Sequence, residues 1–444
     1  MPHPQPSPLT VPAASRLAGR IRVPGDKSIS HRALMLAALA VGESRVEGLL
    51  EGEDVLATAA ALRAMGARIE RDAGGVWTIH GVGVGGLLQP AAALEMGNSG
   101  TSTRLLMGLV ASHPITATFT GDASLSARPM ERVITPLSRM GADITASPGG
   151  RLPLMLRGLC PAVPIEYELP VASAQVKSAI LLAGLNTPGI TRVIEPVPTR
   201  DHSERMLAGF GAQVEVEETA RGRVISITGE AELRPQRIVV PGDPSSAAFW
   251  LVAASIVPGS DVVIENVGLN PTRAGLVTAL RMMGADIAEL DPRTVGGEPV
   301  ADLRVRHAAL SAITVPHDLA PSMIDEYPAL FVAAAFAAGR TVARGADELR
   351  VKESDRIAAM RAALEANGVS VTEHDDGLSI DGTRGDAIPG GGSVATHLDH
   401  RIAMSMTIAA LHARAPVTID DVSPVATSYP VFFDQLADLT GASA

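Results

Sequence analysis

Apolar and polar positions repeat along the chain in one plan: an amphipathic helix ends at a glycine, and a β-rich segment follows. ALRAMGARIE (61–70) and PLSRMGADIT (136–145) both show this order of residue types. Glycine is the usual residue just past a helix end, because the backbone there turns left-handed. The plan predicts six such helix ends, at Gly66, Gly141, Gly211, Gly284, Gly368 and Gly441.

A second series of predicted helices runs out of phase with the first. Each begins at a polar turn and continues into small apolar residues, as in KSAILLAGL or AAFWLVAAS. Two helices and several short strands per repeat, at a period of about 70–85 residues, indicate an α/β protein of six internal repeats. The predicted starts lie near Asp26, Asn98, Ser173, Asp243, Ile324 and Leu398.

The repeats also match at half-chain distance. PGDKSISHRAL (24–34) has the plan of PGDPSSAAFWL (241–251), in which Pro244 takes the first helical position. Lys27 should therefore open its own helix. We predict two similar lobes of three repeats each, joined by two chain crossings that form a hinge. The predicted lobes are 24–240 and 1–23 plus 241–444, with the hinge near 22–25 and 239–242.

Composition narrows the class of protein. The 444 residues are too many for one core, and 46% are hydrophobic, as in a soluble globular chain. A net charge of −11 argues against broad binding to nucleic acid, although a local cluster of Lys and Arg could still hold an anionic substrate.

Targeting and redox signals are few. Cys160 is the single cysteine, so no intrachain disulfide can form and a cytoplasmic location is favoured. The apolar runs 33–41 and 329–338 fall short of the roughly 20 residues that cross a bilayer, so we expect buried helices and no membrane partner. The first 15 residues are Pro-rich, lack the plan of a signal peptide and are predicted to form a flexible tail.

The helix start at Lys27 is the first candidate for chemistry. Ser28 and Arg32 are four residues apart and share a face with one another. A helix start offers free N–H groups and a positive dipole end, which suit a phosphate or carboxylate. Asp26 before Lys27 excludes the P-loop pattern, in which Gly directly precedes Lys. A solvated helix start is the alternative.

Seven short segments follow one another along the chain: PGDKSISHR (24–32), GNSGTSTRL (97–105), GDASLSARPM (121–130), ASAQVKSA (172–179), SMIDEYP (322–328), RVKESDR (350–356) and HLDHRIAM (397–404). Together and in this order they resemble the 5-enolpyruvylshikimate-3-phosphate (EPSP) synthase family. Their residues resemble its second class, which includes glyphosate-tolerant members. The resemblance implies the enolpyruvyl transferase fold, an inside-out α/β barrel in which each lobe has three βαβαββ units.

The family reaction joins shikimate 3-phosphate and phosphoenolpyruvate on the way to chorismate and the aromatic amino acids. The 5-hydroxyl adds to the enol carbon, a tetrahedral intermediate forms, and phosphate leaves; neither a metal nor an organic cofactor is implied. The reaction needs converging cations, a base for the hydroxyl proton and an acid for the methylene carbon. The resemblance also implies a monomer, inhibition by glyphosate, and hinge closure when the shikimate substrate binds.

The resemblance assigns binding residues to each substrate. Ala174 can offer only its backbone. Tolerant second-class members tend to carry Ala at Gly100, so Gly100 predicts greater glyphosate sensitivity here. The residues for shikimate 3-phosphate are Lys27, Ser28, Arg32, Ser173, Ala174, Gln175, Arg200, Asp325 and Lys352. Those for phosphoenolpyruvate are Lys27, Asn98, Gly100, Arg128, Gln175, Arg356 and Arg401.

The resemblance assigns the catalytic roles to Asp325 as base and to Glu353, with Lys27, as acid or proton relay. We expect Lys352, Glu353 and Arg356 to open one helix, with Lys352 and Arg356 on one face. An ordinary helix cap at Asp325 and a surface ladder of ion pairs at 352–356 are the alternatives.

Some features depart from the family or favour another protein. Thr427 and Glu348 stand where many members have Lys and Asn, and the His397 and His400 pair lacks a third metal ligand. UDP-N-acetylglucosamine enolpyruvyl transferase is the nearest alternative, but it usually has Asn where Ser28 stands and a reactive loop cysteine. We expect Cys160 to be buried or idle. A catalytically silent sugar-phosphate-binding protein is a third interpretation.

Overall fold

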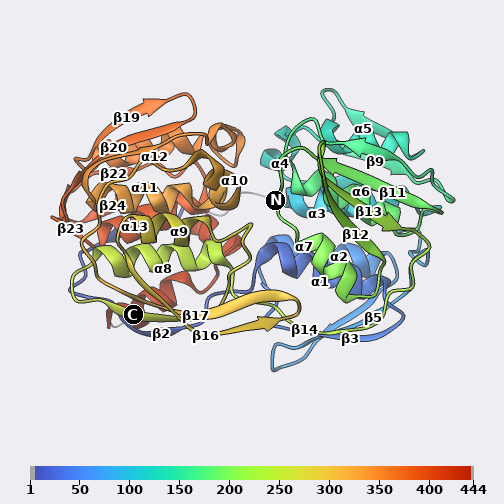
Figure 1. The fold of residues 1–444 in the computed structure, drawn as a ribbon, viewed down its shortest axis with the longest axis horizontal. Helices are drawn as coiled ribbons and strands as arrows, with labels where there is room; N and C mark the ends of the chain where they lie inside the picture. The colour runs from blue at the N-terminus through green and yellow to red at the C-terminus, as the bar shows by residue number, and fades with distance from the viewer. Residues whose placement is uncertain (1–5, 442–444) are drawn as a thin grey trace. The chain divides into compact units, whose positions relative to one another are not determined.

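The computed structural model describes residues 6–441, and within it the chain divides into two compact units (Figure 1). The first unit comprises residues 25–240 with 295–297. The second comprises the described residues before 25 together with 241–294 and 298–441. Each unit has its own hydrophobic core.

Three four-stranded sheets make up the strands of the first unit, and all three have the same plan. A parallel pair is followed by two antiparallel strands, because each repeat runs strand, helix, strand, helix and hairpin. The sheet orders are β14(Arg237–Val239)-β3(Gly42–Glu47)-β5(Trp77–Gly81)-β4(Arg68–Arg71), β6(Leu94–Glu95)-β7(Thr116–Thr120)-β9(Arg151–Arg157)-β8(Asp143–Ser147) and β10(Glu166–Glu168)-β11(Ile190–Glu195)-β13(Gly222–Thr228)-β12(Val214–Thr219).

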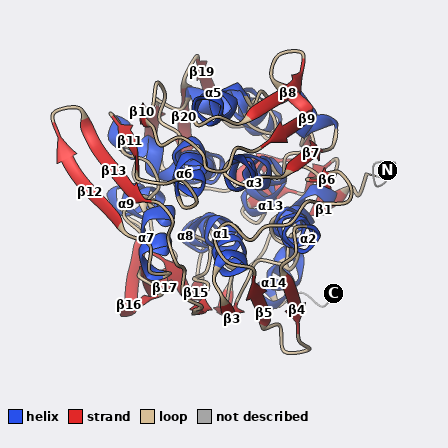
Figure 2. Ribbon diagram, turned by 90° about the vertical axis from the view of Figure 1, so that its right-hand side faces the viewer, coloured by secondary structure: helices blue, strands red, loops and turns tan. Residues whose placement is uncertain are grey.

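The second helix series of the sequence forms the interior of the first unit. Helices α1 (Lys27–Leu39), α3 (Gly100–Ala111) and α6 (Ala174–Gly184) are buried over most of their length, and strands lie around them (Figure 2). Helices that are apolar on all sides require such an enclosed position. The remaining helices of the unit are α2 (Glu53–Ala64), α4 (Ala123–Ala127), α5 (Glu131–Arg139) and α7 (His202–Gly209).

The second unit repeats the plan less regularly. Its buried helices are α8 (Pro244–Ile256), α11 (Tyr327–Phe336) and α13 (His400–Ala410). Its sheets are β16(Asp286–Val295)-β17(Glu298–Arg306)-β15(Asp261–Gly268)-β2(Ala18–Ile21), β18(Ala338–Ala343)-β20(Gly377–Thr383)-β19(Ser370–His374), β1(Leu9–Val11)-β24(Val417–Ile419)-β22(Ser393–Val394) and β21(Ile388–Gly390)-β23(Ala413–Ala415). The other helices are α9 (Gly275–Met282), α10 (Ala320–Met323), α12 (Arg356–Ala366) and α14 (Phe432–Thr440), with 3₁₀ turns η1 (His317–Leu319), η2 (Ile324–Glu326), η3 (Asp347–Val351) and η4 (Ser423–Thr427).

The first sheet of each unit includes a strand that lies, in the sequence, just before the chain crosses to the other unit. β2 precedes α1 in the sequence but pairs with β15 of the second unit, and β14 precedes α8 but pairs with β3 of the first. The chain therefore passes between units next to both helix starts that match at half-chain distance. None of these sheets closes into a barrel of its own.

The repeat predicted from the sequence is confirmed at both kinds of helix boundary. The six glycines all have left-handed backbones, with φ from 67° at Gly441 to 102° at Gly66. Lys27 and Pro244 are the first residues of α1 and α8, and Asp26 and Asp243 cap them. At α3 the cap is Ser99 and not Asn98, because the Ser99 side chain accepts the Ser102 N–H.

The expected flexible tail is wrong for the part of it that the structure describes. Residues Leu9–Val11 form β1, which pairs antiparallel with β24. Ser7 N–H also donates to Asp421 Oδ1 at 3.0 Å. The partner strand lies some 400 positions away, so no local pattern could indicate the pairing; residues 1–5 lie outside the described part. Over residues 6–441, no helix has both the length and the apolar character needed to span a membrane.

Candidate active site

In the first unit, Lys27 lies at the start of α1 with a carboxylate beside it. The Asp26 side chain accepts the Ile29 N–H at 2.9 Å and so fixes the first turn. Lys27 Nζ lies 2.5 Å from Asp54 Oδ2, and the Lys27 side chain is 29% exposed. Sequence analysis missed Asp54, which comes from α2. The ammonium group is thus held in place but accessible, as binding an anionic substrate requires.

Arg32 is buried and oriented by oxygen acceptors from three elements. Its Nε donates to Ser203 Oγ at 2.8 Å, its Nη2 to Ser178 Oγ at 2.7 Å, and its Nη1 to the Ser28 carbonyl at 2.9 Å. The last contact confirms that residues 28 and 32 share a helix face. The two serines come from α7 and α6, and sequence analysis did not assign them a role.

The turn before α3 joins Asn98 to Arg128. Asn98 Oδ1 accepts from Arg128 Nη2 at 2.6 Å, and Asn98 Nδ2 donates to Asp122 at 2.8 Å. Arg128 directly follows α4, and it also donates to Ser124 Oγ at 3.1 Å. These contacts bring two of the predicted phosphoenolpyruvate residues together.

Gln175 connects this turn to the start of α6. Arg104 Nη1 donates to Gln175 Oε1 at 2.6 Å, and Gln175 Nε2 donates to Thr101 Oγ1 at 3.0 Å. Ser173 caps α6, and Ala174 is its first residue, as predicted. Sequence analysis missed Arg104, although it lies in the quoted segment GNSGTSTRL and follows Gly100 by one helical turn. Arg200 lies in the loop between β11 and α7.

A buried polar network lies beneath Lys27. His31 shares a 2.8 Å hydrogen bond with Thr58 Oγ1, which in turn lies 2.7 Å from Ser102 Oγ. Burial lowers the pKa of His31 to about 3, while the charge of Asp54 opposes the shift and that of Lys27 reinforces it. His31 is therefore neutral at physiological pH and its network carries no net charge.

The neutrality of His31 predicts a pH-dependent stability. Its pKa is lower in the folded chain than in the unfolded chain, where it is about 6.5, so the unfolded state binds the extra proton between these values. The stabilisation is full above about pH 6.5 and is lost as the pH falls toward 3. At about 1.4 kcal/mol per pKa unit, we expect His31 to account for a loss of about 2 kcal/mol between pH 6.5 and 5.

Urea unfolding of the wild type and of His31→Asn at pH 7 and pH 5 tests this expectation. Asn keeps a hydrogen-bonding group but cannot titrate, so the variant should lose this share of the pH dependence. His80→Asn, at a side chain that is 41% exposed, is the control and should keep it. Equal pH dependence in His31→Asn and the wild type would contradict the assignment.

In the second unit, the predicted residues gather around Asp325. Lys352 Nζ and Arg356 Nη1 lie 3.7 and 3.5 Å from Asp325 Oδ1. Arg401 Nη1 donates to the Asp325 backbone carbonyl at 2.9 Å. Glu353 joins the group through Arg356, whose Nη2 lies 2.6 Å from Glu353 Oε2. Asp325 itself lies in the turn η2. It is not the N-cap residue of η2 or of α11, since Met323 and Glu326 take those positions.

Asp399 is a further member of this cluster that sequence analysis missed. It caps α13 by accepting the Arg401 N–H at 2.9 Å, and it accepts from Arg356 Nε at 2.8 Å and Ser354 Oγ at 2.9 Å. Burial is the largest influence on the pKa of Asp399 and raises it, but the Arg356 guanidinium, together with His400, holds that pKa below its usual range. Asp399 therefore stays ionised and fixes both arginines.

The predicted helix through Lys352, Glu353 and Arg356 is wrong. Lys352 has an extended backbone after η3, and α12 begins only at Arg356. The reason is the Asp355 side chain, which caps α12 by accepting the Ala358 N–H at 3.1 Å. The residues meet at Asp325 through this bend and not through a shared helix face. Arg356 is almost completely buried, so the cluster is not a surface ladder of ion pairs either.

Other residues singled out in the sequence have ordinary surroundings. Thr427 donates to the Pro424 carbonyl at 2.7 Å, and Glu348 lies in η3. Cys160 is exposed in the segment after β9, so a buried thiol is wrong, while an idle thiol stays a prediction.

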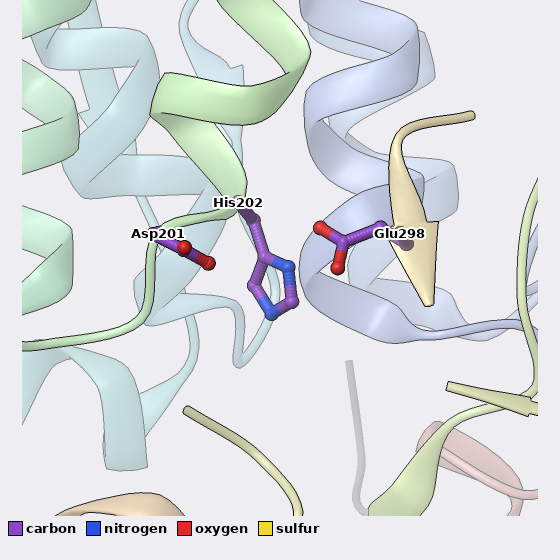
Figure 3. A group of neighbouring side chains, drawn as sticks. All are labelled: Asp201, His202 and Glu298. Atoms are coloured by element: carbon purple, nitrogen blue, oxygen red, sulfur yellow. The ribbon is translucent and has the colours of Figure 1, made fainter. Parts of the chain in front are cut away.

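Figure 3 shows Asp201, His202 and Glu298, whose side chains are of the types that can bind a metal ion. The first two come from the start of α7 in the first unit, and Glu298 opens β17 in the second unit (Figure 3). Within their own units, Asp201 Oδ2 lies 2.9 Å from Arg205 Nε, and Glu298 Oε2 accepts from Asn270 at 2.8 Å. We assign no metal site to them.

The fold of this chain is found in a solved structure. The enolpyruvyl transferase NikO from Streptomyces tendae matches the chain with a TM-score of 0.74 at 20% identity, covering 98% of both chains. This chain, whose mixed α/β units have buried helices and outer strands, therefore has the enolpyruvyl transferase fold, as predicted.

More specific comparisons identify the family. The profile of the family described as EPSP synthase (3-phosphoshikimate 1-carboxyvinyltransferase) matches residues 11–436. A 3-phosphoshikimate 1-carboxyvinyltransferase from Novosphingobium aromaticivorans is 72% identical over 96% of this chain and 97% of its own. An EPSP synthase structure from Acinetobacter baumannii has a TM-score of 0.89 at 49% identity, covering 97% of this chain and 98% of its own. The chain belongs to the EPSP synthase family, which confirms the predicted enzyme, a transferase of aromatic amino acid biosynthesis.

Proposed function

We propose that this chain transfers the enolpyruvyl group of phosphoenolpyruvate to the 5-hydroxyl of shikimate 3-phosphate by addition and elimination. The cluster at Asp325 is the observation that carries the proposal. It places a partly exposed carboxylate among Lys352, Arg356 and Arg401, so that a potential base lies beside cations that suit anionic substrates.

The proposed roles follow from the two sets of residues. Lys27, Ser28, Arg32, Ser173, Ala174, Gln175, Arg200, Asp325 and Lys352 bind shikimate 3-phosphate. Lys27, Asn98, Gly100, Arg128, Gln175, Arg356 and Arg401 bind phosphoenolpyruvate. Asp325 takes the proton of the 5-hydroxyl, and Glu353, with Lys27, delivers a proton to the methylene carbon. Arg356 already holds three carboxylates, so we propose that it exchanges one of them for the phosphoenolpyruvate carboxylate.

Since these residues come from both units, we also propose that the chain acts as two lobes with a hinge near 22–25 and 239–242. Binding of shikimate 3-phosphate would bring the lobes together and exclude water from the reacting groups. The monomeric state, the cytoplasmic location and sensitivity to glyphosate belong to the same proposal.

Release of phosphate from phosphoenolpyruvate tests the function. With shikimate 3-phosphate as acceptor we expect release, and with UDP-N-acetylglucosamine none. Release with the nucleotide sugar alone would support the alternative transferase. A protein that binds shikimate 3-phosphate but releases no phosphate with either acceptor would be a silent binding protein.

Gly100→Ala is expected to weaken phosphoenolpyruvate binding and glyphosate inhibition together. A Cβ at residue 100 would lie 3.1 Å from Arg104 Nη1, so the Arg104 guanidinium is crowded, whereas the 3.6 Å distance to Arg128 Nη1 is an ordinary van der Waals contact. Such crowding typically costs about 1–3 kcal/mol, and 1.4 kcal/mol is a factor of about ten. We therefore expect the KM for phosphoenolpyruvate to rise by about tenfold, with a larger rise in the inhibition constant of glyphosate.

Steady-state kinetics with glyphosate checks the effect of this substitution. Gly209→Ala in α7 is the matched control, because a Cβ there meets no atom within 4 Å. An unchanged KM for phosphoenolpyruvate in Gly100→Ala would show that crowding at residue 100 does not reach the binding site for this substrate.

A further inference from the structure

A charged cluster lies inside the first unit, and none of its members has a role in the proposed reaction. Lys177 Nζ, on α6, lies 2.9 Å from Glu195 Oε2 and 2.7 Å from Glu204 Oε1. The side chains of Lys177 and Glu195 are 0% exposed and that of Glu204 is 7% exposed. We call these three residues the ion triad.

Stability alone does not account for such a cluster. Removing charges from water is costly, and apolar side chains of similar volume often give an equally stable core. Buried ions of this kind have their clearest use in fixing one arrangement of the elements that carry them.

The first element is the loop that carries Arg200. Glu195 is the last residue of β11, and its Oε1 accepts a short hydrogen bond from Thr199 Oγ1. Pro196 and Pro198 restrict the backbone between Glu195 and Thr199, since proline fixes φ. The loop is thus stiff and is tied back to the ion triad at the residue directly before Arg200.

The second element is α7, which is joined to α6 by two adjacent contacts. Lys177 of α6 pairs with Glu204 of α7, and the next residue of α6, Ser178, lies 2.7 Å through its Oγ from Ser203 Oγ. Ser178 and Ser203 are the two hydroxyls that receive the Arg32 guanidinium. The ion triad therefore lies directly beside the contact that orients Arg32.

We propose that the ion triad is a positioning device that holds Arg200 and Arg32 in register for binding shikimate 3-phosphate. This inference rests on the proposed function. The three residues of the ion triad do not touch the substrate in this proposal. They act through the 196–201 loop and through α7. The proposal assigns the affinity for the phosphorylated substrate to residues that a search for substrate contacts would miss.

Thr199→Val tests the proposal with the smallest structural change. It removes the hydrogen bond between the loop and the ion triad and leaves all three charged residues in place. We expect the KM and the dissociation constant for shikimate 3-phosphate to rise by about tenfold, with kcat and the KM for phosphoenolpyruvate within about twofold of wild type. Thr191→Val is the matched control. Thr191 is buried on β11, the strand that ends at Glu195, and its hydroxyl has no hydrogen-bond partner among the described residues, so all constants should stay at wild-type values.

A second variant, Glu204→Gln, changes the contact with α7 and keeps Lys177 paired with Glu195. We expect a rise in the dissociation constant for shikimate 3-phosphate here too, measured by calorimetry on protein whose folding is checked by urea unfolding. Unchanged binding in both variants, or an equal loss for both substrates, would overturn the proposal. If the wild type itself binds and converts no shikimate 3-phosphate, the proposed function fails, and the positioning role fails with it; wild-type turnover with unaffected variants overturns the positioning role alone.

Discussion

Asp325→Asn is expected to lower kcat by a factor of about 10²–10⁴, the usual contribution of a general base. Asn has nearly the same size and keeps an oxygen toward Lys352 and Arg356, but it cannot accept the proton of the 5-hydroxyl. The Asp325 backbone carbonyl still accepts from Arg401, so the substrate-binding cations should stay in place. We therefore expect the KM values to change much less than kcat.

Steady-state kinetics across a range of pH checks this result. The acid limb of the kcat profile, which reports the base in the enzyme–substrate complex, should disappear in the variant. Asp318→Asn, at an exposed position of the neighbouring turn η1, is the matched control and should keep wild-type activity. A variant at residue 325 that keeps kcat within a few-fold of the wild type would remove Asp325 from the role of base.

Arg356→Met is expected to destabilise the protein by about 3–5 kcal/mol, because it leaves the buried carboxylate of Asp399 without its counter-charge. The Arg356 side chain is 1% exposed and the Asp399 side chain is 0% exposed, so water cannot replace the lost partner. Ser354 and the Arg401 N–H still donate to Asp399, but neither carries a charge to it.

The pH dependence of this loss has a definite sign. In the wild type the pKa of Asp399 is held below its usual range, so its contribution is present above about pH 4 and is lost as the pH falls through the folded-state pKa. Without Arg356 the burial of Asp399 raises this pKa, so the variant should be most destabilised at neutral pH and less so near pH 4.

Urea unfolding at pH 7 and pH 4.5 measures both effects. Arg361→Met on the same helix is the matched control: its ion pairs with Glu365 and Glu373 are partly exposed, and it should cost less than about 1 kcal/mol. The double variant Arg356→Met with Asp399→Asn should recover part of the loss. A loss no larger than that of Arg361→Met would show that the buried charges are not coupled as their distances indicate.

Much of the secondary structure was predictable because its signals are local. A glycine after an amphipathic helix and a Ser or Asp before an apolar one act within a few residues. The glycine recurs in all six repeats, and a Ser or Asp cap precedes five of the six buried helices, the exception being α11. Lys27, Pro244 and Ala174 accordingly stand where the sequence placed them. The bend at Lys352 was missed because the Asp355 cap competes with a continuous helix, and spacing alone does not show which wins.

The candidate site was predictable only in part. Residues in the quoted segments were found, whereas Asp54, Ser203 and Glu204 were not, since none stands in those segments. Arg104 and Asp399 do lie in them, but their contacts with Gln175 and Arg356 join elements 71 and 43 positions apart. Side chains with such partners give no periodic signal.

The sequence by itself determined the repeat, the helix boundaries, the family and most of the charged residues of the site. Local backbone preferences and motif chemistry act over short stretches of chain, so they can be read from the sequence. Only the tertiary structure decided which acids pair with which cations, that Leu9–Val11 completes a sheet with β24, and that Lys177 is buried with two glutamates. Those outcomes depend on packing between distant elements, where burial fixes the cost of every unpaired charge and backbone group.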